Sequence, residues 1–227
     1  MDISISLASL AMNYSLGELE SRARYATRGA GYHWGHADEA AAAVRWLESV
    51  DLPGAAVLAA RLKRMEQQTA DPAATGPKAY ARAQCCPIAS SSRLLDTAHS
   101  LEKTIHLQQI EDPLLLVPAF WQLAQTTQTC VSLSWSCAEQ SARLWFDRAG
   151  AGTCAAAPGA LLATVGNQVT AQFDDSAKSE PGKALLKRAR AHIALADWDC
   201  LETFAARTRA PATEESRRLG AGAGTQD

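Results

Sequence analysis

The sequence lacks long apolar runs, a strong excess of charge of one sign, and a basic leader. No apolar stretch reaches the ~20 residues that a membrane-spanning helix needs. The chain has 227 residues and a formal net charge of −2, and its basic residues are dispersed, so no surface attractive to nucleic acid or an anionic membrane is expected. No Lys or Arg precedes Arg22, which argues against a secretory signal. We therefore expect a cytoplasmic protein with neither a nucleic acid nor a membrane as partner.

Cysteine and catalytic signatures are scarce as well. The six cysteines include no C-x-x-C pair, and the neighbours Cys85 and Cys86 have poor geometry for a mutual bridge, so all six are predicted to be reduced. The Gly-x-Ser-x-Gly motif of serine hydrolases and the Walker motif of nucleotide-binding loops are absent. His33 and His36 are close in sequence, but zinc needs more ligands than these two. We therefore expect no metal and no cofactor.

Helix signals fill the N-terminal third of the chain. Hydrophobic residues make up 47% of the sequence, enough for one sizeable core, and the many alanines favour helices. Ser15-Leu16-Gly17-Glu18 has the spacing of a capping box, and Gly29 suits the end of the helix that follows. A second helix is predicted to start near Ala37, and Pro53 suits the first turn of a third. The basic residues of the third helix are predicted to form a solvated face: Arg61, Lys63 and Arg64.

Strand patterns dominate the middle of the chain. Apolar and polar residues alternate most clearly in Val131-Ser132-Leu133-Ser134-Trp135. Other strands are predicted at residues 3–7, 104–107, 114–124, 143–146 and 168–173, and helices at 87–100, 184–196 and 198–207.

Several short strands at close spacing indicate an antiparallel sheet. The predicted fold class is α+β, with a central antiparallel sheet and N-terminal and C-terminal helices packed on it. We expect a single domain over residues 1–227. Its predicted parts are a helical segment (12–68), a loop (69–78), a mixed α/β core (79–207) and a C-terminal tail (208–227).

Three groups of residues together resemble a known family. They lie at 15–20, 28–31, 34–35, 40–41 and 44–47, at Cys86-Pro87-Ile88-Ala89, and at 210–214, 216–217 and 220–224. The chain is similar to the bacterial family of domain of unknown function 3726, and the resemblance would cover nearly all of it from about Met12 onward. This resemblance implies a bacterial cytosolic protein from catabolic gene neighbourhoods that hold oxidoreductases. It implies no known activity and no catalytic residues.

The loop between the first two predicted helices is the first candidate site. Its glycines allow close approach of a ligand, and free N–H groups of the next helix can bind an anion. Arg24 and Arg28 would supply positive charges that balance the charge of the anion. His33 or His36 would serve as a general base, and Trp34 would contact the ligand. The alternative is an ordinary helix–helix corner, with glycines as caps and Trp34 plugging the core.

Cys86 is the second candidate, because it precedes Pro87 at the start of a predicted helix. A thiol at a helix N-terminus can become a nucleophilic thiolate. The alternative is a buried, inert cysteine.

The C-terminal segment is the third candidate. Glu214 and Arg217 lie shortly before Gly220-Ala221-Gly222-Ala223-Gly224, which lacks the strand and helix of a dinucleotide-binding loop. This segment is predicted either to be a flexible tail or to be an arm that packs over a cleft or a neighbouring subunit.

Two functions are compatible with these features. In the first, the protein binds or transforms a small anionic metabolite in bacterial catabolism, in a pocket where Arg28, His33, His36, Glu214 and Arg217 converge. In the second, it is a non-catalytic accessory or assembly subunit. Its Trp-bearing strands (Trp121, Trp135 and Trp145) and its tail would then contact a second copy of the chain or an oxidoreductase partner.

Overall fold

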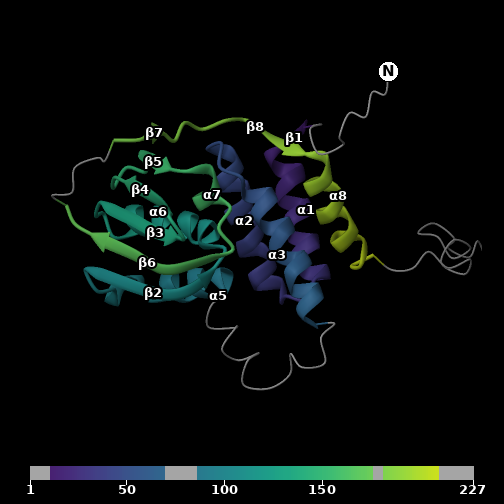
Figure 1. Ribbon diagram of the computed structural model, residues 1–227, viewed down its shortest axis with the longest axis horizontal. Coiled ribbons are helices and arrows are strands. Elements are labelled where there is room, and N and C mark those ends of the chain that lie inside the picture. Colours follow the sequence, from purple (N-terminus) through teal and green to yellow (C-terminus); the bar gives the residue numbers. More distant parts are fainter. Residues whose placement is uncertain (1–10, 70–85, 176–180, 210–227) are drawn as a thin grey trace, which may run out of the picture.

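A computed structural model of the chain describes residues 11–69, 86–175 and 181–209 (Figure 1). The predictions for residues 3–7, 70–78 and 210–227, including Glu214 and Arg217, lie outside these residues. The helices are α1 (Leu16–Gly29), α2 (Trp34–Ser49), α3 (Gly54–Thr69), α5 (Pro87–Asp96), α6 (Val117–Thr126), α7 (Pro158–Leu161) and α8 (Leu195–Ala206). The strands are β1 (Ala11–Ser15), β2 (Thr104–Glu111), β3 (Val131–Cys137), β4 (Gln140–Phe146), β5 (Gly152–Ala156), β6 (Val165–Phe173), β7 (Lys183–Ala184) and β8 (Arg190–Ala194).

The predicted capping box starts α1. The Ser15 hydroxyl accepts from the Glu18 N–H at 3.1 Å, and the Glu18 carboxylate accepts from the Ser15 N–H at 2.9 Å. The helix ends at Gly29, as predicted. The second helix begins at Trp34 rather than Ala37, because His33 already has the extended backbone of an N-cap.

Six strands form an antiparallel sheet in the order β2-β6-β3-β4-β5-β7. Leu133 pairs with Leu144 on one side and with Ala171 on the other, so alternate residues of these strands share one buried face. The fold class is α+β, as predicted. A second sheet of two strands joins β1 to β8, which are far apart in the sequence.

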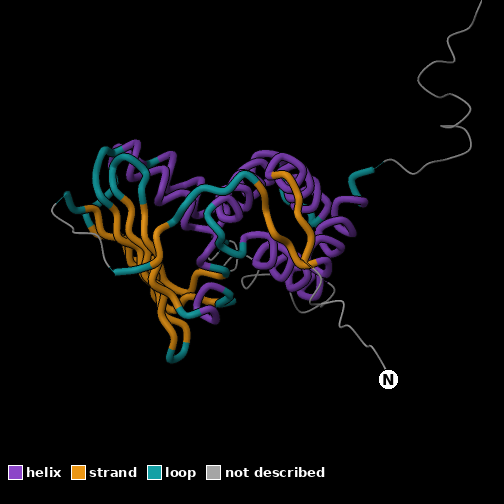
Figure 2. The backbone as a smooth tube through the Cα atoms, turned by 90° about the horizontal axis from the view of Figure 1, so that it is seen from above, coloured by secondary structure: helices purple, strands orange, loops and turns teal. Residues whose placement is uncertain are grey.

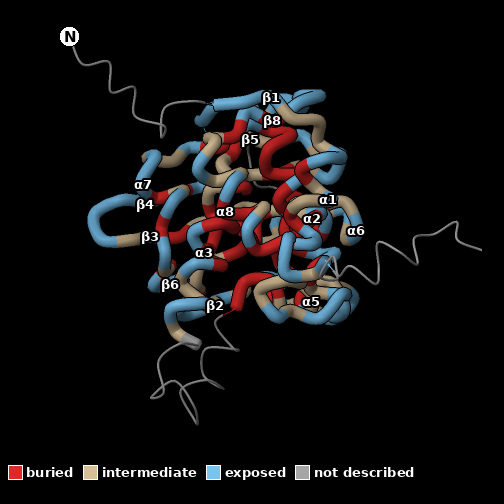
Figure 3. Tube along the Cα trace, turned by 90° about the vertical axis from the view of Figure 1, so that its right-hand side faces the viewer, coloured by how far each residue is buried: buried red, intermediate tan, exposed pale blue. Residues whose placement is uncertain are grey.

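The helices form a second layer beside the six-stranded sheet (Figures 1 and 2). Trp46 of α2 lies 5.3 Å from Trp121 of α6 and 5.9 Å from Phe146 of β4, measured between ring centroids, so these aromatic rings join the layers. One cluster of buried residues runs through the helices and the sheet, and the buried backbone lies at the centre of the molecule in Figure 3. None of the helices in the described ranges is long and apolar enough to cross a membrane.

Residues 114–124, predicted as a strand, are helical. Pro113–Leu116 form a 3₁₀ helix that continues into α6, and this helix packs against the inner face of the sheet. Its residues are buried on nearly all sides, so the apolar run has no helical stripe to distinguish it from a buried strand.

The segment 184–196, predicted as a helix, is extended up to Ala194: it contains the end of β7 and all of β8, and only its last two residues are helical, as the start of α8. Ala191 and Ile193 are buried while Leu186 is 72% exposed, which is the alternation of a strand rather than a helical stripe. Strand β8 exists because β1 supplies its hydrogen-bonding partner from the other end of the chain. The last helix therefore starts at Leu195, three residues earlier than predicted.

Candidate functional site

The two arginines of the first candidate loop are occupied by contacts within the corner. The Arg28 guanidinium donates to the Tyr32 carbonyl oxygen at 2.8 Å and lies 5.5 Å above the Trp34 ring. Arg24 forms an ion pair of 2.7 Å with Asp38 of α2. Both side chains therefore stabilise the turn from α1 to α2.

Trp34 and His33 face outward. Trp34 is 49% exposed and meets the ring of Tyr25 edge-on at 6.0 Å, so it does not plug the core, contrary to the alternative interpretation of this loop. His33 is exposed and makes no side-chain capping bond to α2. His36 is half-buried and lies edge-on to Tyr32, with 6.3 Å between the ring centroids.

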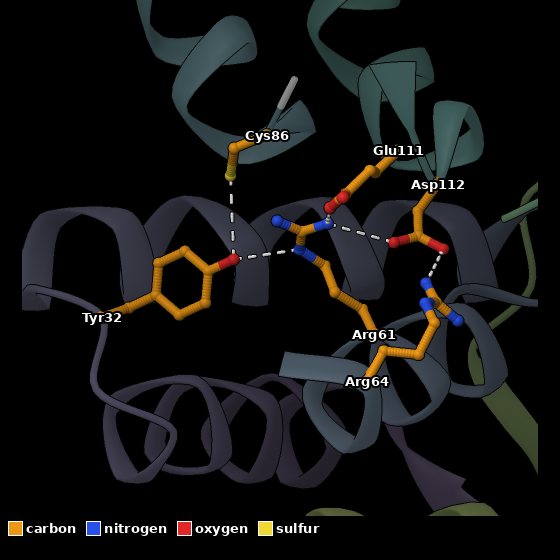
Figure 4. A network of polar contacts seen from close by, with 6 residues as sticks. All are labelled: Tyr32, Arg61, Arg64, Cys86, Glu111 and Asp112. Carbon is orange, nitrogen blue, oxygen red and sulfur yellow. Dashed lines mark hydrogen bonds and ion pairs between the residues drawn. The ribbon is translucent and has the colours of Figure 1, made fainter. Parts of the chain in front are cut away.

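Tyr32 turns inward from the same loop (Figure 4). Its hydroxyl lies 3.7 Å from the Cys86 sulfur, at the start of α5. The same oxygen accepts a hydrogen bond of 2.9 Å from Nε of Arg61 in α3. Tyr32 thus connects three elements that are distant in the sequence.

Arg61 is a deeply buried cation, with only 4% of the residue exposed, and its partner Asp112 is 2% exposed. Its Nη1 donates to Glu111 at 2.8 Å and to Asp112 at 3.1 Å, and Arg64 donates to the other oxygen of Asp112. The prediction that Arg61 belongs to a solvated face is therefore wrong. We call this set of residues the Arg61 cluster: Tyr32, Arg61, Arg64, Cys86, Glu111 and Asp112.

Local structure explains why these residues meet. Arg61 lies one turn after Val57 and Leu58, on the buried face of α3. Asp112 closes the turn after β2 with a left-handed backbone (φ 46°), and its N–H donates to the Thr164 carbonyl at 3.0 Å. Because the turn is held against α3, a buried carboxylate lies opposite the buried guanidinium.

Burial controls the protonation of the cluster. It raises the pKa of the Tyr32 phenol, so this group stays a neutral O–H at neutral pH. Since its oxygen accepts from Arg61, its own proton remains available for the Cys86 sulfur. Burial also raises the pKa of Asp112, and Arg61 and Arg64 oppose that rise.

Cys86 is the N-cap residue of α5, and Pro87 occupies the first helical position, as predicted. The residue is 7% exposed and packs in a small apolar group with Ala40 and Ile88. Cys86 therefore contacts apolar residues as well as the Tyr32 hydroxyl of the Arg61 cluster.

Two of the predicted catalytic residues, His36 and Cys86, meet at Tyr32. Arg28 meets the Arg61 cluster only at the main-chain carbonyl of Tyr32. The recorded contacts of Arg24 and Trp34 are with other residues of the corner. The residues that the sequence interpretation missed are Tyr32, Arg61, Arg64, Glu111 and Asp112. An arginine within the apolar stripe of α3 was the available signal.

Residues 14–86 match a family model described as protein of unknown function (DUF3726). The resemblance to this family is confirmed over residues 14–86. The DUF3726 segment contains Tyr32, Arg61 and Cys86, whereas Glu111 and Asp112 follow it. No curated protein and no solved structure matches the chain.

Within residues 11–69, 86–175 and 181–209, no group of three or more His, Cys, Asp or Glu could hold a metal ion. The chemistry available at the Arg61 cluster is that of a thiol, a neutral phenol and a buried guanidinium.

Proposed function

We propose that the protein binds and transforms a small molecule, with the Cys86 thiol as the nucleophile. The observation that carries this proposal is the position of the Tyr32 hydroxyl between the buried Arg61 guanidinium and the Cys86 sulfur. This function belongs to the small-molecule class expected from the sequence, but its site lies on the inner side of the α1–α2 corner.

The surroundings of Cys86 suit a reacting sulfur. A thiol reacts as its thiolate, which nearby cationic groups and a helix N-terminus both stabilise. Arg61 supplies the cation and α5 supplies the helix N-terminus. Tyr32 can donate a proton to the sulfur or to an atom that leaves it.

Cys200 provides an internal comparison. It is also 7% exposed, but its thiol donates to the Ala59 carbonyl oxygen at 3.6 Å. Burial raises the pKa of the Cys200 thiol, with only a weaker opposing effect from Lys63. Cys86 and Cys200 are equally exposed but have different neighbours. A difference between their reaction rates therefore reports the environment of Cys86 rather than its accessibility.

The test is alkylation of the native protein by iodoacetamide, followed by mass spectrometry that resolves each cysteine. We expect Cys86 to react about tenfold faster than Cys200, and Tyr32→Phe to reduce this difference. Alkylation in denaturant is the control, because there the two thiols should react at similar rates. A native Cys86 that reacts no faster than Cys200 would rule out the proposal.

One observation favours the second candidate function, an accessory subunit. Tyr25 and Trp34 are 44% and 49% exposed and stack edge-on, and exposed aromatic groups are typical of protein contacts. Trp135 is 2% exposed and therefore unavailable for the interface predicted on the strands. Light scattering at micromolar concentration tests this candidate function. We expect the wild type to form an oligomer that Trp34→Ser dissociates. A wild type that is monomeric in every preparation would rule out the accessory function.

A further inference from the structure

A cleft lies between the α1–α2 pair and the segment that leads into β8. Its volume is about 360 Å³, which is within the range of small-molecule sites. None of the six residues of the Arg61 cluster lines it, so the cleft is separate from the site at Cys86. Its polar and aromatic walls come from three separated stretches of the chain and are formed by Glu20, Arg45, Trp46, Ser49, Lys187 and Arg188.

Three of these side chains are cationic, although the whole chain has a net charge of −2. Arg45 pairs with Glu20 at 2.7 Å. Arg188 pairs at 2.7 Å with Asp51, which follows α2. Burial lowers the pKa of the Lys187 amine and Arg45 lowers it further, so these two cations repel each other. An anion bound in the cleft would relieve that repulsion.

Contacts with α2 hold the cations of the β8 segment in place. The Arg188 N–H donates to the Ser49 carbonyl oxygen at 2.6 Å, at the C-terminal end of α2. Lys187 Nζ donates to the Ser49 hydroxyl at 3.1 Å and lies 4.9 Å from the centroid of the Trp46 ring. Donors that are already positioned bind a ligand with a smaller loss of conformational entropy.

Trp46 supplies a second, independent indication of a ligand. The residue is 8% exposed, and its indole Nε1 is buried without a hydrogen-bond partner in the part of the chain that the structure describes. The neighbouring Trp121 differs, because its Nε1 donates to the Gly150 carbonyl oxygen at 3.0 Å. A buried donor without an acceptor is destabilising, and native proteins keep few of them. Since Trp46 lines the cleft, an acceptor atom of a bound ligand would satisfy this donor.

We propose that the cleft binds a small oxyanion, a carboxylate or a phosphate, between Arg45, Lys187 and Arg188. On binding, the Lys187 amine turns from the indole ring to the anion, and the Trp46 N–H gains the acceptor that it lacks. Guanidinium groups suit both kinds of ligand, because their N–H donors match the paired oxygens of either. One carboxylate partner does not exhaust the several donors of each arginine. The site does not depend on the proposed function and stands even if Cys86 proves unreactive.

The test is isothermal titration calorimetry of the full chain with two probes, sodium succinate and inorganic phosphate. Potassium chloride at the same ionic strength is the blank for general screening. We expect at least one probe to saturate with a Kd of about 1 mM or below at low salt, and the tighter probe identifies the ligand as a carboxylate or a phosphate. Tryptophan fluorescence should change with the same Kd, because the Lys187 cation leaves the indole ring.

Charge variants locate the site. Lys187→Gln and Arg45→Gln should each weaken binding about tenfold, because each removes a charge-assisted hydrogen bond to the anion. The matched control is Lys103→Gln, which removes the same charge just before β2 and outside the cleft. It should change the Kd less than about twofold, because salt screens distant surface charges.

Indole variants test the N–H donor. Trp46→Phe keeps an aromatic ring but removes the donor, and it should weaken binding about fivefold. The control Trp121→Phe removes a donor that already has an acceptor in Gly150, so it should weaken binding less. A Trp46→Phe protein that binds as tightly as the wild type would overturn the role of the indole. If Trp46→Phe does not fold, the charge variants decide.

Two results would overturn the oxyanion site as a whole. The first is that neither probe saturates up to about 10 mM. The second is that Lys103→Gln weakens binding as much as Lys187→Gln does, since binding would then follow the overall charge of the protein. Weaker binding in Lys187→Gln and Arg45→Gln, with Lys103→Gln unchanged, would support the site.

Discussion

The Nε of Arg61 donates a hydrogen bond of 2.9 Å to the Tyr32 hydroxyl, across 29 positions of sequence. This bond joins the loop after α1 to the middle of α3, and it brings the buried charge to the phenol that contacts Cys86. The same guanidinium holds Glu111 and Asp112 with its other end. Stability and the proposed chemistry therefore depend on one side chain.

Replacing Arg61 should destabilise the fold strongly. In Arg61→Met the nearly buried Asp112 keeps only Arg64 as a charged partner, and breaking a buried pair typically costs about 3–5 kcal/mol. The control Arg64→Met removes a side chain that is 30% exposed and should cost about 1 kcal/mol. Urea unfolding measures both losses. If the two variants lost the same free energy of unfolding, the burial of Arg61 would not determine its contribution to stability.

Glu48 should make stability fall as the pH rises toward neutrality. Its Oε1 accepts from the Ala55 N–H at 2.9 Å, at the start of α3. Burial raises its pKa from 4.5 to about 7, against the effect of that hydrogen bond, and the nearby Asp51 and Asp197 add to the rise.

The folded state therefore holds the Glu48 proton more tightly than the unfolded state does. This contribution to stability is present in full below about pH 4.5 and is lost as the pH rises through 7, by about 3 kcal/mol. Glu48→Gln keeps an acceptor for Ala55 and cannot ionise, so it should lack this decline. Urea unfolding at several pH values between 4.5 and 8 measures the difference, and parallel curves for the two proteins would contradict the prediction.

Gly29 allows the close approach of α1 and α8. A Cβ at this position would overlap the Phe204 carbonyl oxygen, so Gly29→Ala should cost about 1–3 kcal/mol by forcing the helices apart. Gly17, near the start of α1, has open space around its Cβ position. The matched control Gly17→Ala should therefore stabilise the protein by about 0.5–1 kcal/mol. Thermal unfolding distinguishes the two, and shifts of the same sign would count against this packing argument.

Lys187 links the segment before β8 to the aromatic junction between the layers. Its Nζ lies 4.9 Å from the Trp46 and Trp121 ring centroids and donates to the Ser49 hydroxyl at 3.1 Å. Burial lowers the pKa of this amine, and Arg45 lowers it further. We expect Lys187→Ala to cost about 1 kcal/mol.

The control for Lys187 is Lys183→Ala. Lys183 makes an exposed ion pair with Asp51, and such a pair should contribute less than about 0.5 kcal/mol. The loss for Lys187→Ala should also persist at 1 M salt better than that for Lys183→Ala, because the aromatic contact is less screened. Urea unfolding at low and high salt measures this difference.

The elements that the sequence predicted well depend on neighbouring residues. The capping box of α1, the alternation of β3 and the proline at the start of α5 act within a few positions, so they are visible in the sequence. The two wrong elements depend on distant partners. Strand β8 requires β1, and α6 is buried between other elements, so local periodicity could not identify either.

The candidate site likewise contains residues that the sequence identified and residues that it missed. Cys86 and His36 were identified from the sequence by their reactive residue types. Cys86 lies at the start of α5, as predicted, whereas His36 lies in the first turn of α2 rather than in a loop. Arg61 was assigned to a solvated face because its neighbours Lys63 and Arg64 are basic. Its burial follows from the turn at Asp112, which no pattern near Arg61 reveals.

The sequence by itself determined the N-terminal helices, four of the six strands of the larger sheet, the α+β class and the family resemblance over residues 14–86, since short-range patterns carry this information. Only the tertiary structure decided which side chains surround Cys86. Tyr32, Arg61 and Asp112 come from three separated segments, and a buried charge is stable only where its partners converge on it.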